Sequence, residues 1–231
     1  MDQKRWREGL VALALQPRNL ARAMSRQMGD AAPRTTTILA LDGQWLKLIQ
    51  MDGPPQGRRV VKLLAVGVEQ AGPEQIQRAF REACTVEALV AGEVLIANPT
   101  HLCTVRLFSL PSTDPKEIRD IVELQAEKHT PYAKEEIVTD FTVIERDRSG
   151  YSRVLLIIAH QDVIHRLVQF ADGASLLLDR VGCELEGLIS WFKASKKASA
   201  GQDAGILIVD VDGGTTTLLV MQRGLPRFHR S

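Results

Sequence analysis

The fold is decided by the segment GILIVDVDGGTTTLLVM, which runs from Gly205 to Met221. Its apolar run at residues 206–209 predicts a buried strand, and the sequence Asp212-Gly213-Gly214 predicts a tight turn. The β-branched and apolar residues 216–221 predict that the chain returns as a second strand. The segment therefore predicts a hairpin whose turn is rich in acidic, glycine and threonine residues.

Such a hairpin has the residue types that hold the phosphates of a nucleotide. Gly213 and Gly214 let backbone N–H groups approach an anion, and the hydroxyls of Thr215 and Thr216 can add hydrogen bonds to phosphate oxygens. Asp210, at the strand end, can hold Mg²⁺ directly or through water. The alternative is an ordinary hairpin in which these residues only shape the turn, and the segment by itself does not decide between the two.

The composition is that of an ordinary globular chain. Of its 231 residues, 45% are hydrophobic and 25% are charged, which suits one large domain or two small ones. The 29 basic residues nearly balance the 28 acidic ones, and only 5% of the residues are aromatic. Because neither a basic field nor many stacking side chains are present, we expect no nucleic-acid partner.

The cysteines and histidines indicate a cytoplasmic chain without a histidine metal site. Three cysteines that lie far apart, with no C-x-x-C spacing, fit a reducing compartment. The five histidines form no i,i+4 pair and no HExxH motif, so none is assigned as a metal ligand. No apolar run reaches the roughly 18 residues that span a bilayer, so we expect neither a membrane span nor export.

The first 28 residues are basic and amphipathic. They contain six Lys or Arg residues against two acidic ones, a local excess of +4. Two short helices broken at Pro17 are predicted by the spacing of Trp6, Leu10, Leu13, Leu20, Met24 and Met28. Arg18, Arg22 and Arg26 share one helical face, which favours attraction to an anionic membrane surface or an acidic partner helix. The alternative is a solvated basic face on a helix docked against the domain, and residues 29–34 then form a linker.

The rest of the chain predicts an α/β protein. Asp42-Gly43 predicts a tight hairpin, and Asp114-Pro115 with Glu117 predicts a helix start with a capping box. The predicted strands are 35–41, 44–51, 58–68, 86–91 or 93–97, 102–110, 140–145, 153–159 and 176–181. The predicted helices begin at Pro73 and span 114–129, 162–171 and 184–196. Residues 102–181 therefore predict a β-α-β-β-α-β unit inserted after a first α/β unit.

A long ordered set of motifs lies between residues 106 and 141. It consists of Arg106-Leu-Phe-Ser-Leu-Pro111, a helix with Glu123 and Glu127, the turn Thr130-Pro131-Tyr132, the segment Glu135-Glu136-Ile137-Val138, and Asp140-Phe141. This order resembles the actin-like type IV pilus assembly protein PilM family, in which an Arg-x-x-x-Leu-Pro strand end precedes a Glu-rich helix, a Pro-aromatic turn and an Asp-bearing strand. The resemblance runs from about Thr36 to the end of the chain.

The resemblance implies an actin-like (ribonuclease H-like) fold with an inserted ferredoxin-like subdomain, shared with the cell-division protein FtsA. Residues 35–100 and 182–200 would form the first actin-like subdomain, and residues 101–181 the inserted one. Residues 205–231 would begin the second lobe, while residues 1–34 lie outside the resemblance. We expect the second lobe to be truncated after Ser231, without its adenine-binding glycine motif.

The resemblance also identifies two phosphate-binding hairpins, which match the family unequally. Aligned on Lys47, the first hairpin has Ala40 where the family has Asp, Asp42 where it has Gly, and Trp45 where small residues are usual. Lys47 remains to neutralise phosphate charge, although an ordinary strand lysine fits as well. The second hairpin keeps Asp210, the glycines Gly213 and Gly214, and the threonines Thr215 and Thr216, with Asp212 where the family has its first Gly.

The implied function is that of a cytoplasmic scaffold at the inner membrane. Its partner would be the cytoplasmic tail of a PilN-like membrane protein, with peripheral membrane contact through residues 1–28, and self-association stays open. ATP and Mg²⁺ are the implied cofactors of a longer chain, with Asp210 as the metal ligand. Because one hairpin is degenerate and phosphoryl transfer needs both lobes, we expect no ATP hydrolysis by residues 1–231 and assign no catalytic residue.

Two alternatives start from the same residues. The sequence Asp210-x-Asp-Gly-Gly-Thr resembles the phosphate signature of ROK-type sugar kinases, but in those kinases the motif opens the chain and the sugar pocket follows it. The cytoplasmic domain of a GspL-like type II secretion protein shares the fold ancestry and normally continues into a transmembrane helix. The position of the motif counts against the kinase, whereas the secretion protein remains open.

Overall fold

The computed structural model describes residues 35–41, 44–54, 57–68, 72–86, 92–195, 204–212 and 214–231. It divides into two compact units. Unit 1 contains the described residues from Thr35 to Ala97 together with His165–Gly182, and unit 2 contains the described residues of Asn98–Ile164 and Cys183–Ser231. In the parts of the chain that are described, no helix is both long enough and apolar enough to cross a membrane.

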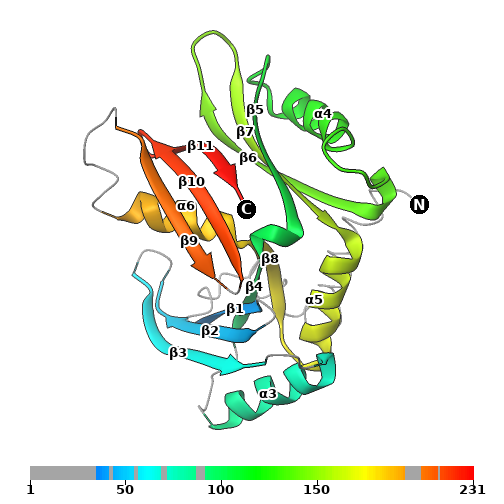
Figure 1. Ribbon diagram of the computed structural model, residues 1–231, viewed down its shortest axis with the longest axis vertical. Coiled ribbons are helices and arrows are strands. Elements are labelled where there is room, and N and C mark those ends of the chain that lie inside the picture. The colour runs from blue at the N-terminus through cyan, green and yellow to red at the C-terminus, as the bar shows by residue number, and fades with distance from the viewer. Residues whose placement is uncertain are drawn as a thin grey trace, which may run out of the picture. The chain divides into compact units, whose positions relative to one another are not determined.

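Unit 1 is built on a five-stranded sheet with the strand order β3-β2-β1-β4-β8 (Figure 1). Its strands are β1 (Thr35–Leu41), β2 (Trp45–Asp52), β3 (Arg59–Gly67), β4 (Glu93–Asn98) and β8 (Leu178–Cys183). The first three strands form an antiparallel meander, and β4 runs parallel to β1. The three-strand meander predicted from the sequence is confirmed, and so is the strand predicted at residues 93–97.

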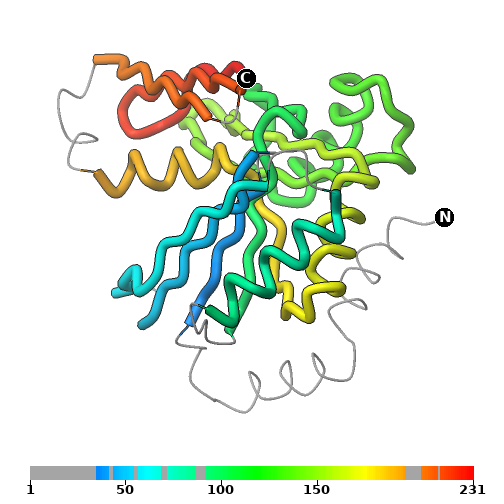
Figure 2. Tube along the Cα trace, turned by 60° about the horizontal axis from the view of Figure 1, so that its bottom comes forward, coloured from blue at the N-terminus to red at the C-terminus, as the bar shows by residue number. Residues whose placement is uncertain are grey.

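The core of unit 1 lies on one face of this sheet. Helix α3 (Pro73–Val86) and the part of α5 (Gln161–Gly173) that belongs to unit 1 both cover that face (Figure 2). Alternate strand residues such as Leu39 and Leu48 point toward the helices and are 1% exposed, because side chains alternate between the two faces of a strand. Phe80 of α3 meets Phe170 of α5 edge to face, with ring centroids 5.9 Å apart.

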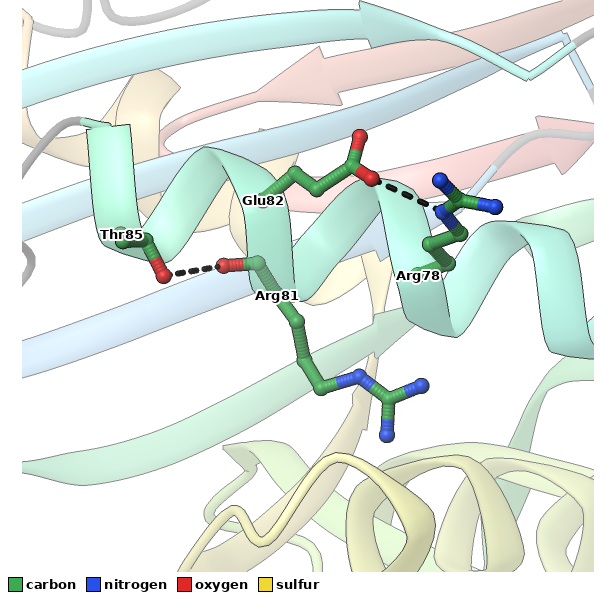
Figure 3. Close-up of polar contacts among 4 residues, drawn as sticks. All are labelled: Arg78, Arg81, Glu82 and Thr85. Carbon is green, nitrogen blue, oxygen red and sulfur yellow. Dashed lines mark hydrogen bonds and ion pairs between the residues drawn. The ribbon is translucent and has the colours of Figure 1, made fainter.

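Polar contacts on α3 accompany this packing. Arg81 donates a hydrogen bond from Nη1 to the carbonyl oxygen of Gly173 at 3.2 Å, which satisfies one of the carbonyls at the C-terminal end of α5. Arg78 and Glu82 form an exposed i,i+4 ion pair of 2.8 Å, and the hydroxyl of Thr85 donates to the carbonyl of Arg81 (Figure 3). The Arg81 contact therefore ties the two core helices together.

Unit 2 contains a three-stranded antiparallel sheet with the order β5-β7-β6. Its elements are β5 (Cys103–Leu110), β6 (Ile137–Arg146), β7 (Ser152–His160) and helix α4 (Pro115–Ala126), preceded by a 3-10 turn, Thr100–Leu102, and joined by another, Lys134–Glu136. Helix α4 covers one face of the sheet, where Ile118, Val122 and Leu156 are at most 1% exposed (Figure 1).

The predicted helix start at Asp114 is confirmed, but the hydrogen bonds of its capping box differ from the expected pattern. Asp114 Oδ1 accepts hydrogen bonds from the backbone N–H groups of Lys116 and Glu117 at 2.9 and 3.0 Å. In a simple capping box the Glu117 carboxylate would accept from the backbone of Asp114. Here the hydroxyl of Ser112 lies between them: it accepts from the Asp114 N–H at 3.1 Å and donates to Glu117 at 2.6 Å.

A second sheet of unit 2 has the order β11-β10-β9 and packs with helix α6. These elements are α6 (Glu184–Ala194), β9 (Ile206–Asp212), β10 (Thr215–Gln222) and β11 (Leu225–Arg230). Leu185 of α6 and Leu219 and Met221 of β10 are at most 1% exposed and belong to one apolar cluster. The hairpin predicted for residues 205–221 is therefore confirmed, and a third strand, β11, follows it.

One strand belongs to a different sheet from the one predicted. The pattern placed the strand near residues 176–181 in the inserted β-α-β-β-α-β unit, whereas β8 lies at the edge of the sheet of unit 1. There the N–H of Val94 donates to the carbonyl of Leu177, and Leu167 and Phe170 of α5 pack into the core of unit 1. Of the predicted β-α-β-β-α-β unit, only the β-α-β-β part is therefore observed around one sheet. Local periodicity predicts a strand but does not determine which strand it pairs with.

Some sequence expectations fall on residues that the structure does not describe. They concern the helices and linker of residues 1–34, the turn Asp42-Gly43, residues 87–91 of the alternative strand, and Gly213 of the second hairpin.

Candidate functional site: two phosphate-type hairpins

The first hairpin of interest is formed by β1 and β2 of unit 1. Lys47 pairs with Ala40 across the two strands, and Leu46 pairs with Leu41. Lys47 is half-buried and lies on the sheet face opposite the helices, because Leu46 and Leu48 on either side of it point into the core. Ala40 brings no carboxylate to this face, so β1 itself offers no metal ligand beside Lys47.

Trp45 lies on the same face as Lys47 and contacts the neighbouring strand. It pairs with Gly67 of β3 and is 44% exposed. Its Cζ3 atom lies 3.8 Å from the position that a Cβ atom on Gly67 would occupy, so the indole covers the strand where the side chain is missing. The tryptophan therefore has a packing role on β3, next to the strand end where the resemblance predicts small residues.

The second hairpin is formed by β9 and β10 of unit 2, and its register separates the predicted residues. Asp210 pairs with Thr217 and Asp212 with Thr215, whereas Thr216 pairs with Val211. Because paired residues share a face and neighbours alternate, Asp210 and Thr215 lie on one face and Thr216 lies on the other. The structure thus brings together two of the predicted side chains and excludes the third from their face.

The threonine hydroxyls of this hairpin make hydrogen bonds within unit 2. Thr215 Oγ1 donates to the carbonyl oxygen of Asp212 at 2.9 Å, across the turn in which Gly214 has φ +87°. Thr217 is 8% exposed, and its Oγ1 lies 2.8 Å from Ser231 Oγ. Thr217 shares the face of Asp210 and was not among the predicted site residues, although the period of two along β10 would have identified it.

The charges of the second hairpin are unfavourable for a phosphate by itself. Asp210 is exposed and Asp212 is half-buried on the same face, two residues closer to the turn. Two carboxylates repel a phosphate unless a cation lies between them. Within the described ranges, no group of three or more His, Cys, Asp or Glu residues could hold a metal ion by itself.

The described residues do not fit a complete Mg-nucleotide site. The first hairpin supplies Lys47 without a strand carboxylate, and the second supplies Asp210 and Thr215 with an additional negative charge. No phosphoryl-transfer step is derived from this arrangement.

A pair of cysteines in unit 2 was not recognised in the sequence, because 80 positions separate them. The thiols of Cys103, at the start of β5, and Cys183, before α6, form a hydrogen bond. This bond and burial raise the pKa of Cys103, whose sulfur also accepts from Asn98 Nδ2 at 3.0 Å. Cys183 Sγ lies 3.9 Å from the hydroxyl of Thr100. Neither of these two cysteines forms a disulfide, and both belong to the apolar packing between β5 and α6.

The chain was compared with known protein families, protein sequences and solved structures. No protein-family model and no curated protein sequence matches the chain. Among solved structures, the chain is similar to one described as "PilM-PilN type IV pilus biogenesis complex", with a TM-score of 0.73 and 18% identity, over 84% of this chain and 60% of that one. It is also similar to the cytoplasmic domain of EpsL, an inner-membrane component of the type II secretion system of Vibrio cholerae (TM-score 0.51, 10% identity, 82% and 68% covered).

A third similar structure is a protein of Bacteroides thetaiotaomicron with an actin-like ATPase fold and unknown function. Its TM-score is 0.55 and its identity 11%, over 85% of this chain and 68% of that one. At these identities the likenesses show the fold, and the predicted actin-like α/β architecture is confirmed. The chain spans 60% of the length of the first of these structures.

Proposed function

We propose that this chain is a cytoplasmic, actin-like scaffold component of type IV pilus assembly, or of a related secretion system, peripheral to the inner membrane. The observation that carries the proposal is the likeness to the chain of the PilM-PilN complex, which extends over most of the described residues. By analogy with that complex, the partner is the cytoplasmic tail of a PilN-like inner-membrane protein.

The two hairpins support a scaffold rather than an ATPase. Ala40 removes a carboxylate from the first hairpin, and Trp45 packs beside it on β3. In the second, Thr215 is hydrogen-bonded within the turn and Thr216 faces away from Asp210. Catalysis of phosphoryl transfer is almost entirely positioning and charge neutralisation, so ATP and Mg²⁺ would bind weakly at most. In unit 1 the residue that would contact a phosphate is Lys47, and in unit 2 these residues would be Asp210 and Thr215, with Gly213 and Gly214 in the turn.

Attachment to the membrane would be electrostatic. The local charge of +4 in residues 1–28 is attracted to anionic headgroups by about 1 kcal/mol per basic residue near the surface. Such attraction weakens as ionic strength rises, so vesicle binding should fall when salt is added.

The proposal is tested with a defined partner. A synthetic peptide with the sequence of the cytoplasmic tail of the cell's own PilN-like bitopic protein is immobilised, and binding of the purified full chain is measured by biolayer interferometry. A peptide of the same composition in scrambled order is the control. Specific binding supports the proposal, and equal binding to both peptides contradicts it.

A deletion strain separates pilus assembly from type II secretion, for which the likeness to the EpsL domain is the specific support. Electron microscopy would show loss of surface pili if the chain serves pilus assembly, whereas a secreted-enzyme assay would show the defect if it serves type II secretion. Normal pili together with normal secretion would contradict both.

A further inference from the structure

Strand β3 of unit 1 exposes an unusual amount of apolar surface for an edge strand. Val60, Val61 and Leu63 are 61%, 53% and 73% exposed, and together they are called the β3 patch. Edge strands of soluble proteins are usually protected by charged side chains, by Pro or by a covering element. An exposed apolar patch of this kind is typical of an interaction surface.

Leu63 also continues an apolar row across the sheet. It pairs with Ile49 of β2, which pairs with Ile38 of β1, which pairs with Leu95 of β4. These three neighbours are half-buried and lie on the face opposite the core formed with α3 and α5. Within the β3 patch, Leu63 is thus the exposed end of an apolar row that crosses four strands.

The position where the N-terminal segment joins the sheet is close to this patch. Thr35, the first residue of β1, pairs with Asp52, which pairs with Arg59 at the start of β3. From Thr35 to Leu63 is two strand spacings across and three residues along, a distance of about 14 Å. A six-residue linker such as residues 29–34 spans up to about 20 Å, so residue 28 can reach the patch.

The sequence before the linker has a face that fits it. In a helix of 100° per residue, Leu20, Met24 and Met28 form one stripe, and Arg18, Arg22 and Arg26 form another about 200° away from it. Burying the apolar stripe would leave the arginines in solvent. The orientation is required by charge, because Arg58 and Arg59 at the start of β3 are exposed and would repel the arginine stripe.

We propose that residues 18–28 dock as an amphipathic helix on the β3 patch, with Leu20, Met24 and Met28 against Leu63 and the arginines facing outward. The short linker gives the segment an effective concentration in the millimolar range, far above that of a second copy of the chain at micromolar concentration. This inference goes beyond the proposed function and does not depend on it. It also implies that the apolar stripe is unavailable for insertion into a membrane.

The test measures how fast a thiol at position 63 reacts with a maleimide in the full chain. Leu63→Cys is compared with Val86→Cys on α3, which is 80% exposed, each rate being normalised to the unfolded protein and assigned by peptide mass spectrometry. Docking predicts that Leu63→Cys reacts at least about tenfold more slowly than Val86→Cys. Equal rates would overturn the proposal.

Two double substitutions in the Leu63→Cys background identify what covers the patch. Leu20→Glu with Met24→Glu places charges in the apolar stripe and should raise the rate to that of Val86→Cys. Arg18→Glu with Arg22→Glu is the matched control on the opposite stripe and should leave the rate unchanged. Slow labelling that is indifferent to the apolar-stripe change would assign the cover to another element and overturn the proposal.

Disulfide trapping distinguishes docking of residues 18–28 from coverage of the β3 patch by a second copy of the chain or by lipid. With diamide as the oxidant, Met24→Cys and Leu63→Cys should form a disulfide within one chain, whereas Arg22→Cys and Leu63→Cys should not. A disulfide that appears only in dimers on a non-reducing gel would assign the patch to a second copy. Protection of Leu63→Cys only when phosphatidylglycerol vesicles are present would assign it to lipid. Either of these two results would overturn the proposal.

Discussion

The two phosphate-type hairpins share their packing and differ in their polar residues. In β1 and β2, Leu39 and Leu48 are buried, and in β10 Leu219 and Met221 are buried in the same alternating way. In the first hairpin Ala40 and Lys47 occupy the opposite face from these leucines, whereas in the second Asp210 and Thr217 lie on the same face as Leu219 and Met221, nearer the turn. Because packing and chemistry lie on different residues of the same strands, a hairpin can lose its ligands and keep its fold.

The largest effect should come from removing the shared feature, the buried leucines. Leu48→Ala and Leu219→Ala should each lower the free energy of unfolding by about 2–5 kcal/mol, because each leaves a cavity in a core. Urea unfolding followed by circular dichroism measures this. Leu207→Ala on β9, where the side chain is 58% exposed, is the control and should change stability by less than about 0.5 kcal/mol. A similar loss for Leu207 and Leu219 would break the comparison, because the two faces of the second hairpin would then be equally buried.

Glycine-to-alanine substitutions should change the free energy of unfolding by a smaller amount, with opposite signs in the sheet of the first hairpin and in helix α6 of unit 2. A Cβ on Gly92 would overlap the carbonyl oxygen of Thr35, at the point where β4 begins beside β1. Gly92→Ala should therefore cost about 1–3 kcal/mol. In α6, Gly187 has no atom near the position of its Cβ, and Gly187→Ala should stabilise by about 0.5–1 kcal/mol. Loss of stability in both variants would show that close approach is not the cause.

The pH dependence should be smaller and confined to unit 2. Burial and the nearby Arg106 lower the pKa of His229 below its ordinary value of 6.5. The unfolded chain then takes up a proton at higher pH than the folded chain does, so the stability from this residue is complete above about pH 6.5 and is lost as the pH falls below that value. The effect is modest because the ring remains half accessible to solvent.

The measurement is the urea midpoint at about pH 7.5 and pH 5.5, for the wild type and His229→Gln. The wild type should lose more stability on acidification than the variant. If both lose the same amount, the pH dependence comes from other groups.

The smallest expected signal is that of nucleotide binding. We expect little binding because the first hairpin has Ala40 in place of a carboxylate. Titration of Mg-ATP into the purified chain, followed by calorimetry, should show negligible binding, and Asp210→Ala should leave the result unchanged. Micromolar binding that Asp210→Ala abolishes would show instead that the second hairpin suffices, and would reverse the conclusion drawn from Ala40 and Trp45.

Much of the fold could be predicted because the signals are local. The strand at Thr35–Leu41 and the helix cap at Asp114 follow from the spacing of apolar residues and from one side chain bonding to nearby N–H groups. The pairing of β8 with β4 could not be predicted in this way, because it joins residues more than 80 positions apart. The Cys103–Cys183 contact was hidden for the same reason.

The candidate site was predictable in composition and less so in geometry. Residue types identified Asp210, Thr215 and Thr216 together, whereas the register places Thr216 on the other face and Thr217 beside Asp210. A one-residue change of register exchanges the two faces of a strand. That register depends on how Leu219 and Met221 pack with α6, which is a tertiary contact.

The sequence by itself therefore determined the element order, the apolar periodicity, the actin-like resemblance and the loss of an Asp at Ala40, since each is a property of neighbouring residues. Tertiary structure alone decided which sheet β8 joins, which hydroxyls face Asp210, and that Trp45 covers Gly67. These features depend on contacts between distant segments, whose pairing is selected by the burial of apolar surface in the whole unit rather than by any local pattern.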